Sequence, residues 1–551
     1  MRRAYVALAV FFVASLLTAD SIQKLPPLVE RIDVSVTNVD VVVTDGAGHP
    51  VGGLSRDDFE IYEDGVPQFL TNFYAIQDAT VRLATREDSS EGSVDPDQFR
   101  RKIVLLIDNN FIPKPSRDAA LARLDEFLES HVAANCEWTL IAIGHTVTTV
   151  QPFTSSKKQM HAAIDRVRHM PTFDEQRSMD REILSDPVRR TGLIDALGNN
   201  DFGTTVQFKA REQTMRNLGA TQNTARAVIQ TCRAFTAAEG KKIVILVTGG
   251  MEMNTTFKAY EGQGDPILSE MKRQTEETLD LIVREANAAN VNLYVIAARN
   301  RGMQAPQHDV VNKSAGTNPG TVGSMQDVLG GGPIDTTDVD TSSRILAMGT
   351  GGLYLPANNV GRGLDRIDEE TSTYYSLGFS PQHGEDGVYH HISVRVKQRG
   401  LEVRHREGYT NVSLDQRLEQ SLLAPITLPK EQGSLPVRLA LGIPDADKEG
   451  LAVPVVAELP LRLFAIVPHD EAYAGRVHIY LSIYDGDGNN VGYHHFVKDL
   501  TVARDEYACI NTAVFHYRTT LRLKPGQFTI LVTLRDDVTN ELGTAMQILR
   551  L

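Results

Sequence analysis

The spacing of hydrophobic residues divides this chain into segments of two kinds. In residues 30–80, 373–410 and 434–551, apolar and polar side chains alternate, which is the period of a strand with one buried face. Asp-Gly pairs and other glycine-containing turns break these segments into short strands. They predict antiparallel β structure, with 434–551 as a C-terminal β-sandwich of immunoglobulin-like or related type.

Residues 101–372 follow a different rhythm, in which short apolar runs alternate with longer segments of helical period. This order predicts a mostly parallel sheet with helices on both faces. The predicted strands are 103–108, 138–144, 146–153, 241–250, 291–298 and 352–357, and the predicted helices are 117–133, 157–168, 206–238, 266–289, 341–348 and 361–371.

Polar stretches without either period predict linkers and loops. Residues 83–100 are acidic and residues 412–432 contain two prolines, so both predict linkers between domains. Within the α/β segment, 169–205 predicts an insertion and the glycine-rich 299–340 a mobile loop. The predicted fold class is therefore a multidomain protein of α/β plus all-β type.

The N-terminal residues 1–19 have the pattern of a signal peptide. Arg2 and Arg3 precede an uncharged apolar run that ends near Ala19, a small residue suited to cleavage. An uncleaved membrane anchor is the alternative, but the run is short for a spanning helix. No later segment is apolar enough to span a membrane, so we expect an exported, periplasmic or extracellular protein without a transmembrane segment in its mature chain.

Composition narrows the class of partner. The chain has 551 residues, 42% of them hydrophobic and 23% charged, as in soluble globular proteins. Its formal net charge is -14, and no segment is a block of basic residues. Both observations argue against nucleic acid or an anionic membrane as the main partner. Of the three cysteines, Cys136 and Cys232 are a candidate disulfide pair, while buried unpaired thiols, with Cys509 as the third, are the alternative.

Five blocks of the sequence together point to one family. They are VVVTDGAGHPVGGLSRDDFEIYEDGVPQ, VQPFTSSKKQMHAAI, GKKIVILVTGG, MGTGGLYLPANN, and TSTYYSLGFSP with the later VRVKQRGLEVRHREGY. In this order they resemble the VWFA-related proteins, an exported family described mainly from acidobacteria that carries a von Willebrand factor type A-like domain. The resemblance covers residues 30–410. It implies a von Willebrand A-type fold for 101–372, Rossmann-like with a mostly parallel sheet, flanked by β-sandwich domains.

The resemblance also implies that the A-type domain is inserted into a β-sandwich. Residues 30–80 and 373–410 each predict only about three strands, and such thin sheets bury more apolar surface by pairing with each other. We therefore expect these two segments to share one sandwich.

A-type domains typically bind Mg²⁺ through an Asp-x-Ser-x-Ser motif after the first strand, completed by a distant Thr and an Asp. In this chain Asp108 matches the first acid, and Asn110 stands at the first Ser with an amide oxygen that could ligate. Ile112 stands at the second Ser and Gly249 at the later Asp, and Thr221 is the candidate Thr.

These departures predict a degenerate metal site. A hard divalent ion gains affinity with the number and charge of its oxygen ligands, so one carboxylate and one amide predict weak Mg²⁺ binding at best. The alternative is that Asp108 only caps a turn. We therefore expect no cofactor, with Mg²⁺ as the one candidate.

Other motifs predict no chemistry. Residues 484–490 (YDGDGNN) resemble a calcium loop, but Phe496 replaces the required Glu, which favours a hairpin turn. The pairs His390-His391 and His494-His495 lie on predicted strands, where neighbours point to opposite faces, so neither pair can chelate one ion. No catalytic motif appears, and we expect a protein that is not an enzyme.

The leading functional hypothesis is an exported, non-enzymatic binding or adhesion protein. Its partner would be an unidentified protein or extracellular ligand, recognised at the carboxyl edge of the parallel sheet, where open α/β sheets bind ligands. A Mg²⁺-dependent adhesion module is the first alternative. A hydrolase of extracellular polymer is the second, and it predicts His and acidic side chains converging in one cleft. The loops at the predicted edge are 109–116, 219–224, 249–264 and 299–340.

Overall fold

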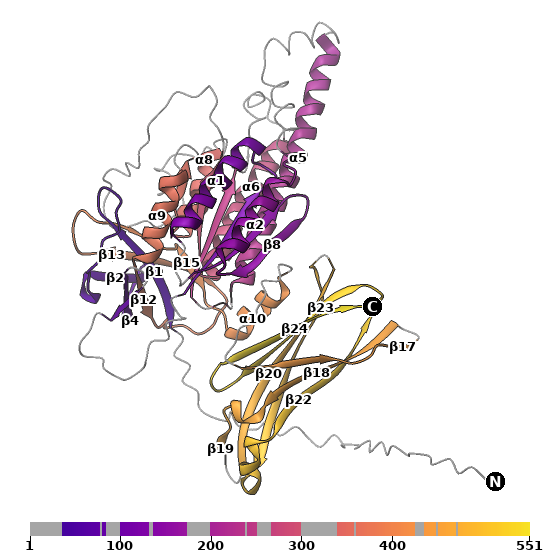
Figure 1. Ribbon diagram of the computed structural model, residues 1–551. Coiled ribbons are helices and arrows are strands. Elements are labelled where there is room, and N and C mark those ends of the chain that lie inside the picture. The colour runs from indigo at the N-terminus through magenta and orange to yellow at the C-terminus, as the bar shows by residue number, and fades with distance from the viewer. Residues whose placement is uncertain are drawn as a thin grey trace, which may run out of the picture.

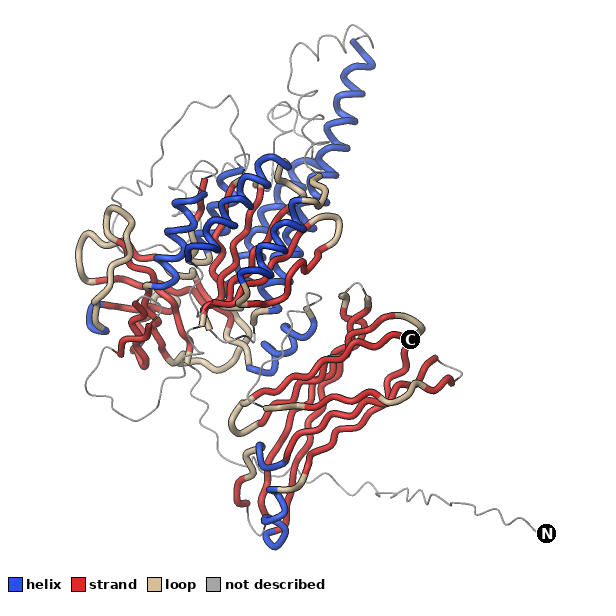
Figure 2. The backbone as a smooth tube through the Cα atoms, viewed as in Figure 1, coloured by secondary structure: helices blue, strands red, loops and turns tan. Residues whose placement is uncertain are grey.

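The computed structural model describes three strand-rich or mixed regions of the chain (Figures 1 and 2). The predicted signal peptide 1–19, and most of the predicted linker 83–100, insertion 169–205 and loop 299–340, lie outside the described residues. The described residues are 36–77, 80–83, 100–131, 136–173, 199–236, 238, 240–250, 266–298, 339–356, 360–424, 435–447, 450–469, 472–486 and 488–551.

The α/β region contains a six-stranded sheet in the order β11-β10-β9-β6-β7-β8. All neighbouring strands are parallel except β8, which runs antiparallel to β7 at one edge. The mostly parallel sheet is confirmed. The strands are β6 (Arg101–Asp108), β7 (Cys136–Ile143), β8 (Val147–Thr154), β9 (Lys241–Thr248), β10 (Val291–Ala297) and β11 (Tyr354–Pro356).

Helices cover both faces of this sheet, so every residue of its central strands β9 and β10 is buried (Figure 1). Each face has its own apolar cluster, which contains side chains of the sheet and of the three helices on that face. On the first face lie α1 (Lys114–His131), α2 (Lys157–Arg168) and α9 (Val360–Ser372), and on the second α5 (Asn199–Ala234), α6 (Pro266–Ala288) and α8 (Val339–Gly349).

Strands from before and after the α/β region form one β-sandwich. Its two sheets have the orders β14-β1-β12-β4-β5 and β15-β13-β2-β3. A single apolar core contains side chains from both segments, among them Val41, Phe59, Leu377 and Ile392. The strands are β1 (Thr37–Thr44), β2 (Phe59–Glu63), β3 (Val66–Gln68), β4 (Leu70–Gln77), β5 (Thr80–Leu83), β12 (Tyr374–Phe379), β13 (Tyr389–Val396), β14 (Glu402–Arg404) and β15 (Gly408–Thr410), with a short 3-10 helix at Arg56–Asp58.

The pattern of residues 401–409 predicts one strand, and this prediction is wrong. Residues 402–404 form β14, which pairs with β1 in one sheet, and residues 408–410 form β15, which pairs with β13 in the other. The chain crosses between the sheets at Arg406, whose buried guanidinium donates to the carbonyls of Asn287 and Asn38.

The C-terminal region is a second β-sandwich with a core from both of its sheets. One sheet joins β16, β17, β18 and β22, and the other joins β19, β20, β21, β23 and β24. Their bounds are β16 (Arg438–Leu441), β17 (Asp445–Asp447), β18 (Gly450–Pro460), β19 (Val467–His469), β20 (Ala472–Asp485), β21 (Asn490–Ala503), β22 (Val514–Leu523), β23 (Gln527–Asp536) and β24 (Leu542–Arg550), with 3-10 helices at Leu461–Leu463 and Arg504–Asn511.

The predicted linker 412–432 contains a helix, α10 (Leu414–Leu423), which corrects the prediction for its first half. Ser413 and Gln416 form a reciprocal capping box at its start, which satisfies backbone donors of the first turn. Helix α10 lies between the α/β region and the C-terminal sandwich (Figure 1), with Ser421 donating to the carbonyl of Ala234 and Tyr484 donating to that of Leu422. The two prolines of 412–432 follow the helix and lie outside the described residues.

No helix among the described residues is long and apolar enough to cross a bilayer. The candidate disulfide is not formed: Cys136 and Cys232 are buried free thiols in the apolar clusters on opposite faces of the parallel sheet. Cys509 is also free, but it is exposed on the 3-10 helix that follows β21.

The thiols should therefore differ in reactivity. Burial raises the pKa of Cys136 and that of Cys232, so the reactive thiolate form is scarce at neutral pH. Burial also keeps reagents away from both sulfur atoms. In the native protein we expect one thiol per chain, Cys509, to react with Ellman's reagent, and all three after denaturation in guanidinium chloride. A second thiol reacting at a similar rate in the native state would contradict this arrangement.

The interface between the α/β region and the first sandwich contains a buried carboxylate. Glu370 on α9 is fully buried and pairs with Arg366 and with Arg404 of β14. The isosteric change Glu370→Gln removes the charge that both guanidinium groups face, so we expect a loss of about 3 kcal/mol of unfolding free energy. Urea unfolding followed by the fluorescence of Trp138, the single tryptophan, measures this loss.

The exposed neighbour Glu369 gives the matched control, and Glu369→Gln should leave the unfolding midpoint unchanged. Equal midpoints for the two variants would show that the Glu370 pairs do not stabilise this interface.

Candidate functional site

The centre of the parallel sheet is a topological switch point. From β6 the chain adds β7 and β8 on one side, then continues at β9, β10 and β11 on the other. The connections after β6 and β9 therefore leave the carboxyl edge in opposite directions. In open α/β sheets, ligands bind outside the carboxyl ends of the strands at such a point. Asp108 ends β6 here, beside Thr248 at the end of β9.

The Asp108 carboxylate is fully buried and held by donors from three elements. The hydroxyl of Thr248 donates to Oδ2 at 2.8 Å, and the hydroxyl of Thr224 on α5 donates to Oδ1 at 3.1 Å. The backbone N–H of Asn110 also donates to Oδ1, at 3.1 Å, which is an Asx-type turn. The carboxylate thus fixes β6, β9 and α5 relative to one another.

The other positions of the predicted metal site are filled by protein. The side-chain amide of Asn110 donates to the carbonyl of Gly144 and to Thr224, and Ile112 is fully buried in the apolar core. A Cβ at Gly249 would lie 1.8 Å from the carbonyl oxygen of Phe111. The backbone after β6 therefore occupies the space that the side chain of an acid at position 249 would need.

The threonine beside Asp108 is Thr224, not the predicted Thr221. Both are buried on α5, and Thr221 lies one helical turn before the contact. The sequence pattern did not define how this helix is rotated against the sheet. It could therefore not decide which of two threonines, three residues apart on the helix, faces Asp108. Much of the predicted recognition surface, 251–264 and 299–338, lies outside the described residues.

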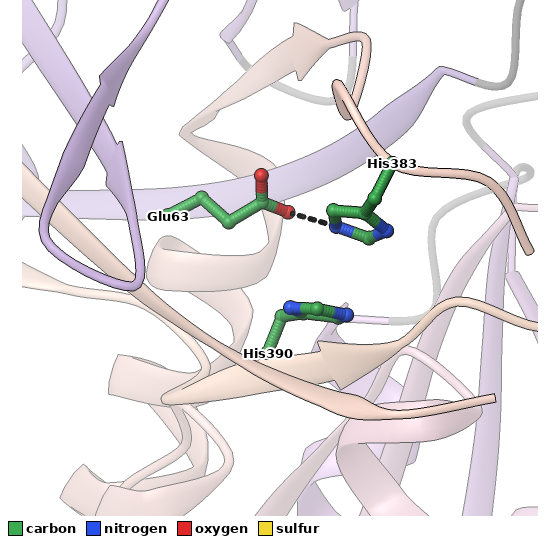
Figure 3. Close-up of side chains that lie close together, drawn as sticks. All are labelled: Glu63, His383 and His390. Atoms are coloured by element: carbon green, nitrogen blue, oxygen red, sulfur yellow. Dashed lines mark hydrogen bonds and ion pairs between the residues drawn. The ribbon is translucent and has the colours of Figure 1, made fainter. Parts of the chain in front are cut away.

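A second constellation lies in the first sandwich, where Glu63, His383 and His390 converge (Figure 3). Glu63 ends β2, His390 lies on the adjacent β13, and His383 lies in the connection from β12 to β13. The two imidazole rings stack with centroids 3.9 Å apart, and Nε2 of His383 is 3.2 Å from Oε1 of Glu63. Glu63 and His390 are buried, while His383 is partly exposed.

Sequence reasoning missed this cluster. It considered the pair His390-His391 only as two ligands of one ion, whereas one member of the pair meets partners from distant segments. Glu63 is separated from His383 by 320 residues along the chain. A signal was present in the sequence. One segment has the acidic pair Glu63-Asp64 at a hairpin turn, and the other has three histidines close together. The expectation that the two segments share a sandwich could have brought these groups together.

Hydrogen-bond acceptors near the His383 ring determine the direction in which its pKa is shifted. Partial burial lowers the pKa of His383, but hydrogen bonds from its ring to the carbonyl of Gly384 and to Glu63 outweigh burial, and its pKa is raised above the ordinary value. The environment therefore favours a cation on or beside this ring.

A third group, Asp415, His478 and His495, lies between α10 and the C-terminal sandwich. Arg535 enters this group, with Nη2 2.6 Å from Oδ1 of Asp415. Burial lowers the pKa of His478, and the nearby Arg535 lowers it further. Here the cation facing the carboxylate is already supplied by the protein.

The sequence matches no protein-family model and no curated protein. Among solved structures, the chain is similar to an aerotolerance-related membrane protein from Bacteroides fragilis, at 10% identity and a TM-score of 0.23 over 49% of this chain and 98% of that one. It is also similar to the conserved hypothetical protein BatB from Bacteroides thetaiotaomicron, at 12% identity and a TM-score of 0.23 over 49% and 97%. A β-glucuronidase from Bacteroides uniformis matches at 11% identity and a TM-score of 0.15, over 34% of this chain and 20% of that one. Similarity at this level does not place the chain in a family.

The close approach at Gly249 makes a testable prediction. Gly249→Ala places a methyl group against the Phe111 carbonyl, so the backbone after β6 must move, and we expect a loss of about 2 kcal/mol of stability. Urea unfolding measures it. Gly361→Ala on α9 is the control, because a Cβ there meets nothing within 4 Å, and its stability should be unchanged or slightly higher. Unaltered stability of the Gly249 variant would show that the two segments are not in contact.

Proposed function

We propose that this chain is an exported, non-enzymatic binding protein that recognises a protein or other extracellular ligand at the carboxyl edge of an A-type α/β domain. The observation that supports the proposal most directly is the switch point between β6 and β9, where two connections diverge above the sheet. The N-terminal signal pattern of residues 1–19 supports export.

Recognition at this edge is proposed to be independent of a divalent cation. The hydroxyls of Thr224 and Thr248 already donate to Asp108, and Gly249 and Ile112 supply neither the second acid nor the second Ser hydroxyl of the A-type motif. Mg²⁺ gains affinity with the number and charge of its oxygen ligands, so a single carboxylate that is already hydrogen-bonded supports weak binding at best. The ligand would instead meet the exposed turn at His145, after β7, because residues 109–112 after β6 are buried.

A hydrolase requires a nucleophile or activated water beside the converging His and acidic groups. The two convergent groups in the described residues lie in the β-sandwich regions, away from the switch point. We therefore keep the non-enzymatic proposal for the α/β domain.

Site-specific photo-crosslinking tests the proposed surface. His145 lies at the carboxyl edge and its ring already contacts Phe173, so a photoreactive phenylalanine analogue at His145 preserves an aromatic contact. In cells that export the chain, we expect crosslinked adducts of discrete mass from position 145, formed equally well in EDTA and in MgCl₂.

The control places the same analogue at Arg123, an exposed position on the outer face of α1. Adducts no stronger at 145 than at 123 would refute recognition at this edge. Adducts at 145 that require MgCl₂ would instead support the Mg²⁺-dependent adhesion module.

A further inference from the structure

We propose that Glu63, His383 and His390 bind a divalent transition-metal ion of the zinc class, which clamps the strands preceding the α/β domain to the strands that follow it. This site lies in the first sandwich, and the proposal does not depend on the function proposed for the sheet edge. It concerns a different set of side chains and a different ion from the Mg²⁺ considered at Asp108.

The three side chains offer the right ligand atoms at nearly the right spacing. One carboxylate oxygen and one nitrogen from each ring lie within 4.8 Å of one another. A tetrahedral Zn²⁺ ion with bonds of about 2.0–2.2 Å holds its ligand atoms about 3.3 Å apart. The 3.2 Å separation of Glu63 Oε1 and His383 Nε2 already meets this value. The His390 ring is stacked on His383, so it must turn out of the stack to direct one nitrogen at the same point. Two imidazoles and one carboxylate are a ligand set that zinc takes in proteins, with a fourth position left for water.

Outer partners hold each ligand in place, as metal sites require. Nδ1 of His383 is 3.0 Å from the carbonyl of Gly384, which can only accept, so the tautomer with the proton on Nδ1 satisfies that carbonyl and directs the lone pair of Nε2 towards Glu63. The Glu63 carboxylate accepts hydrogen bonds from Tyr409 and, at 3.2 Å, from Gln68.

His390 has a carboxylate partner at each nitrogen. Asp64 Oδ2 lies 2.8 Å from its Nδ1, and Asp386 Oδ2 lies 3.1 Å from its Nε2. Whichever nitrogen turns to the metal, the other keeps an aspartate that orients the ring.

Oxygen acceptors surround the two rings. All four ring nitrogens of His383 and His390 lie within hydrogen-bond distance of oxygen acceptors, but a neutral imidazole has only one N–H to donate. A divalent ion bound to one nitrogen of each ring satisfies both rings, because the other nitrogen of each keeps its N–H for the remaining acceptor. The three surrounding carboxylates of Glu63, Asp64 and Asp386 more than balance the two positive charges of the ion.

The Asp415 group shows the contrast. Its histidines, His478 and His495, are also close, with 3.1 Å between ring nitrogens, but Arg535 already pairs with Asp415. A fixed guanidinium repels a divalent ion and uses the carboxylate that would ligate it. This group is therefore the matched control for metal binding.

The position of the site defines its structural effect. Glu63 lies on β2 and His390 on β13, and these strands pair directly, with Ile392 opposite Glu63. Along the covalent chain, the segments that carry these two strands are connected through the inserted α/β domain. An ion bound to the folded state and not to the separated segments stabilises the sandwich by mass action.

The test uses the untagged full chain, stripped with EDTA and then titrated with ZnCl₂ alone. We expect one Zn²⁺ per chain by calorimetry and a rise in melting temperature of roughly 5 °C at saturation. CoCl₂ in place of zinc should give the visible absorption bands of a tetrahedral Co²⁺ site. The variants H383Q and E63Q should lose the bound ion, the temperature shift and the cobalt bands.

His383 lies outside the strands, so H383Q leaves the backbone hydrogen bonds of the strand ladders intact, and the circular dichroism of the variant should match that of the parent. H391Q, the exposed neighbour of His390, and H478Q in the arginine-filled group should both retain the full response to zinc. The proposal is overturned if zinc gives no response in the parent chain or the same response in H383Q. It is equally overturned if NMR titration in saturating zinc shows both His383 and His390 as imidazolium.

Discussion

Strand β12 is the element on which the rest of the structure depends. All six of its residues are buried, and it pairs with β1 on one side and β4 on the other. Because roughly 300 residues separate it from these partners, closing the sheet costs the chain the entropy of a long loop unless the intervening chain holds its own two ends together. The α/β domain meets this requirement: Arg101 at its first strand donates to Asp368 and Thr371 at the end of its last helix. The inserted domain therefore lowers the entropy cost of closing the sandwich.

Ion pairs are prominent in the interface between the α/β region and the first sandwich. Lys241 of β9 is buried and pairs with Asp40 of β1, and Glu370 pairs with the Arg404 of β14. Buried ion pairs add little net stability relative to apolar packing, but they tolerate no wrong partner, since an unpaired buried charge is costly. They therefore fix how the sandwich docks on the amino edge of the parallel sheet. The opposite, carboxyl edge stays available for loops.

Sequence reasoning was most successful where a signal is local and periodic. The alternation of apolar runs and helices predicted the parallel sheet and its two helical layers, with boundaries within a few residues for most elements. It was least successful where the result depends on how one element packs against another. Thr224 replaced Thr221 beside Asp108 because helix rotation is decided by packing of α5 on the sheet. The helix α10 was missed because the prolines that follow it dominated the composition of its segment.

By itself, the sequence determined the alternation of strands and helices in the α/β region, and that position 249 offers no acid and position 112 no hydroxyl, since these depend on residue type and spacing. Only the tertiary structure decided that Phe111 fills the space beside Gly249, and that Glu63 meets His383 and His390. The physical reason is that such contacts join residues distant in the chain, and their existence depends on strand register. A shift of one residue along β2 or β13 would turn Glu63 or His390 to the opposite face of the sheet.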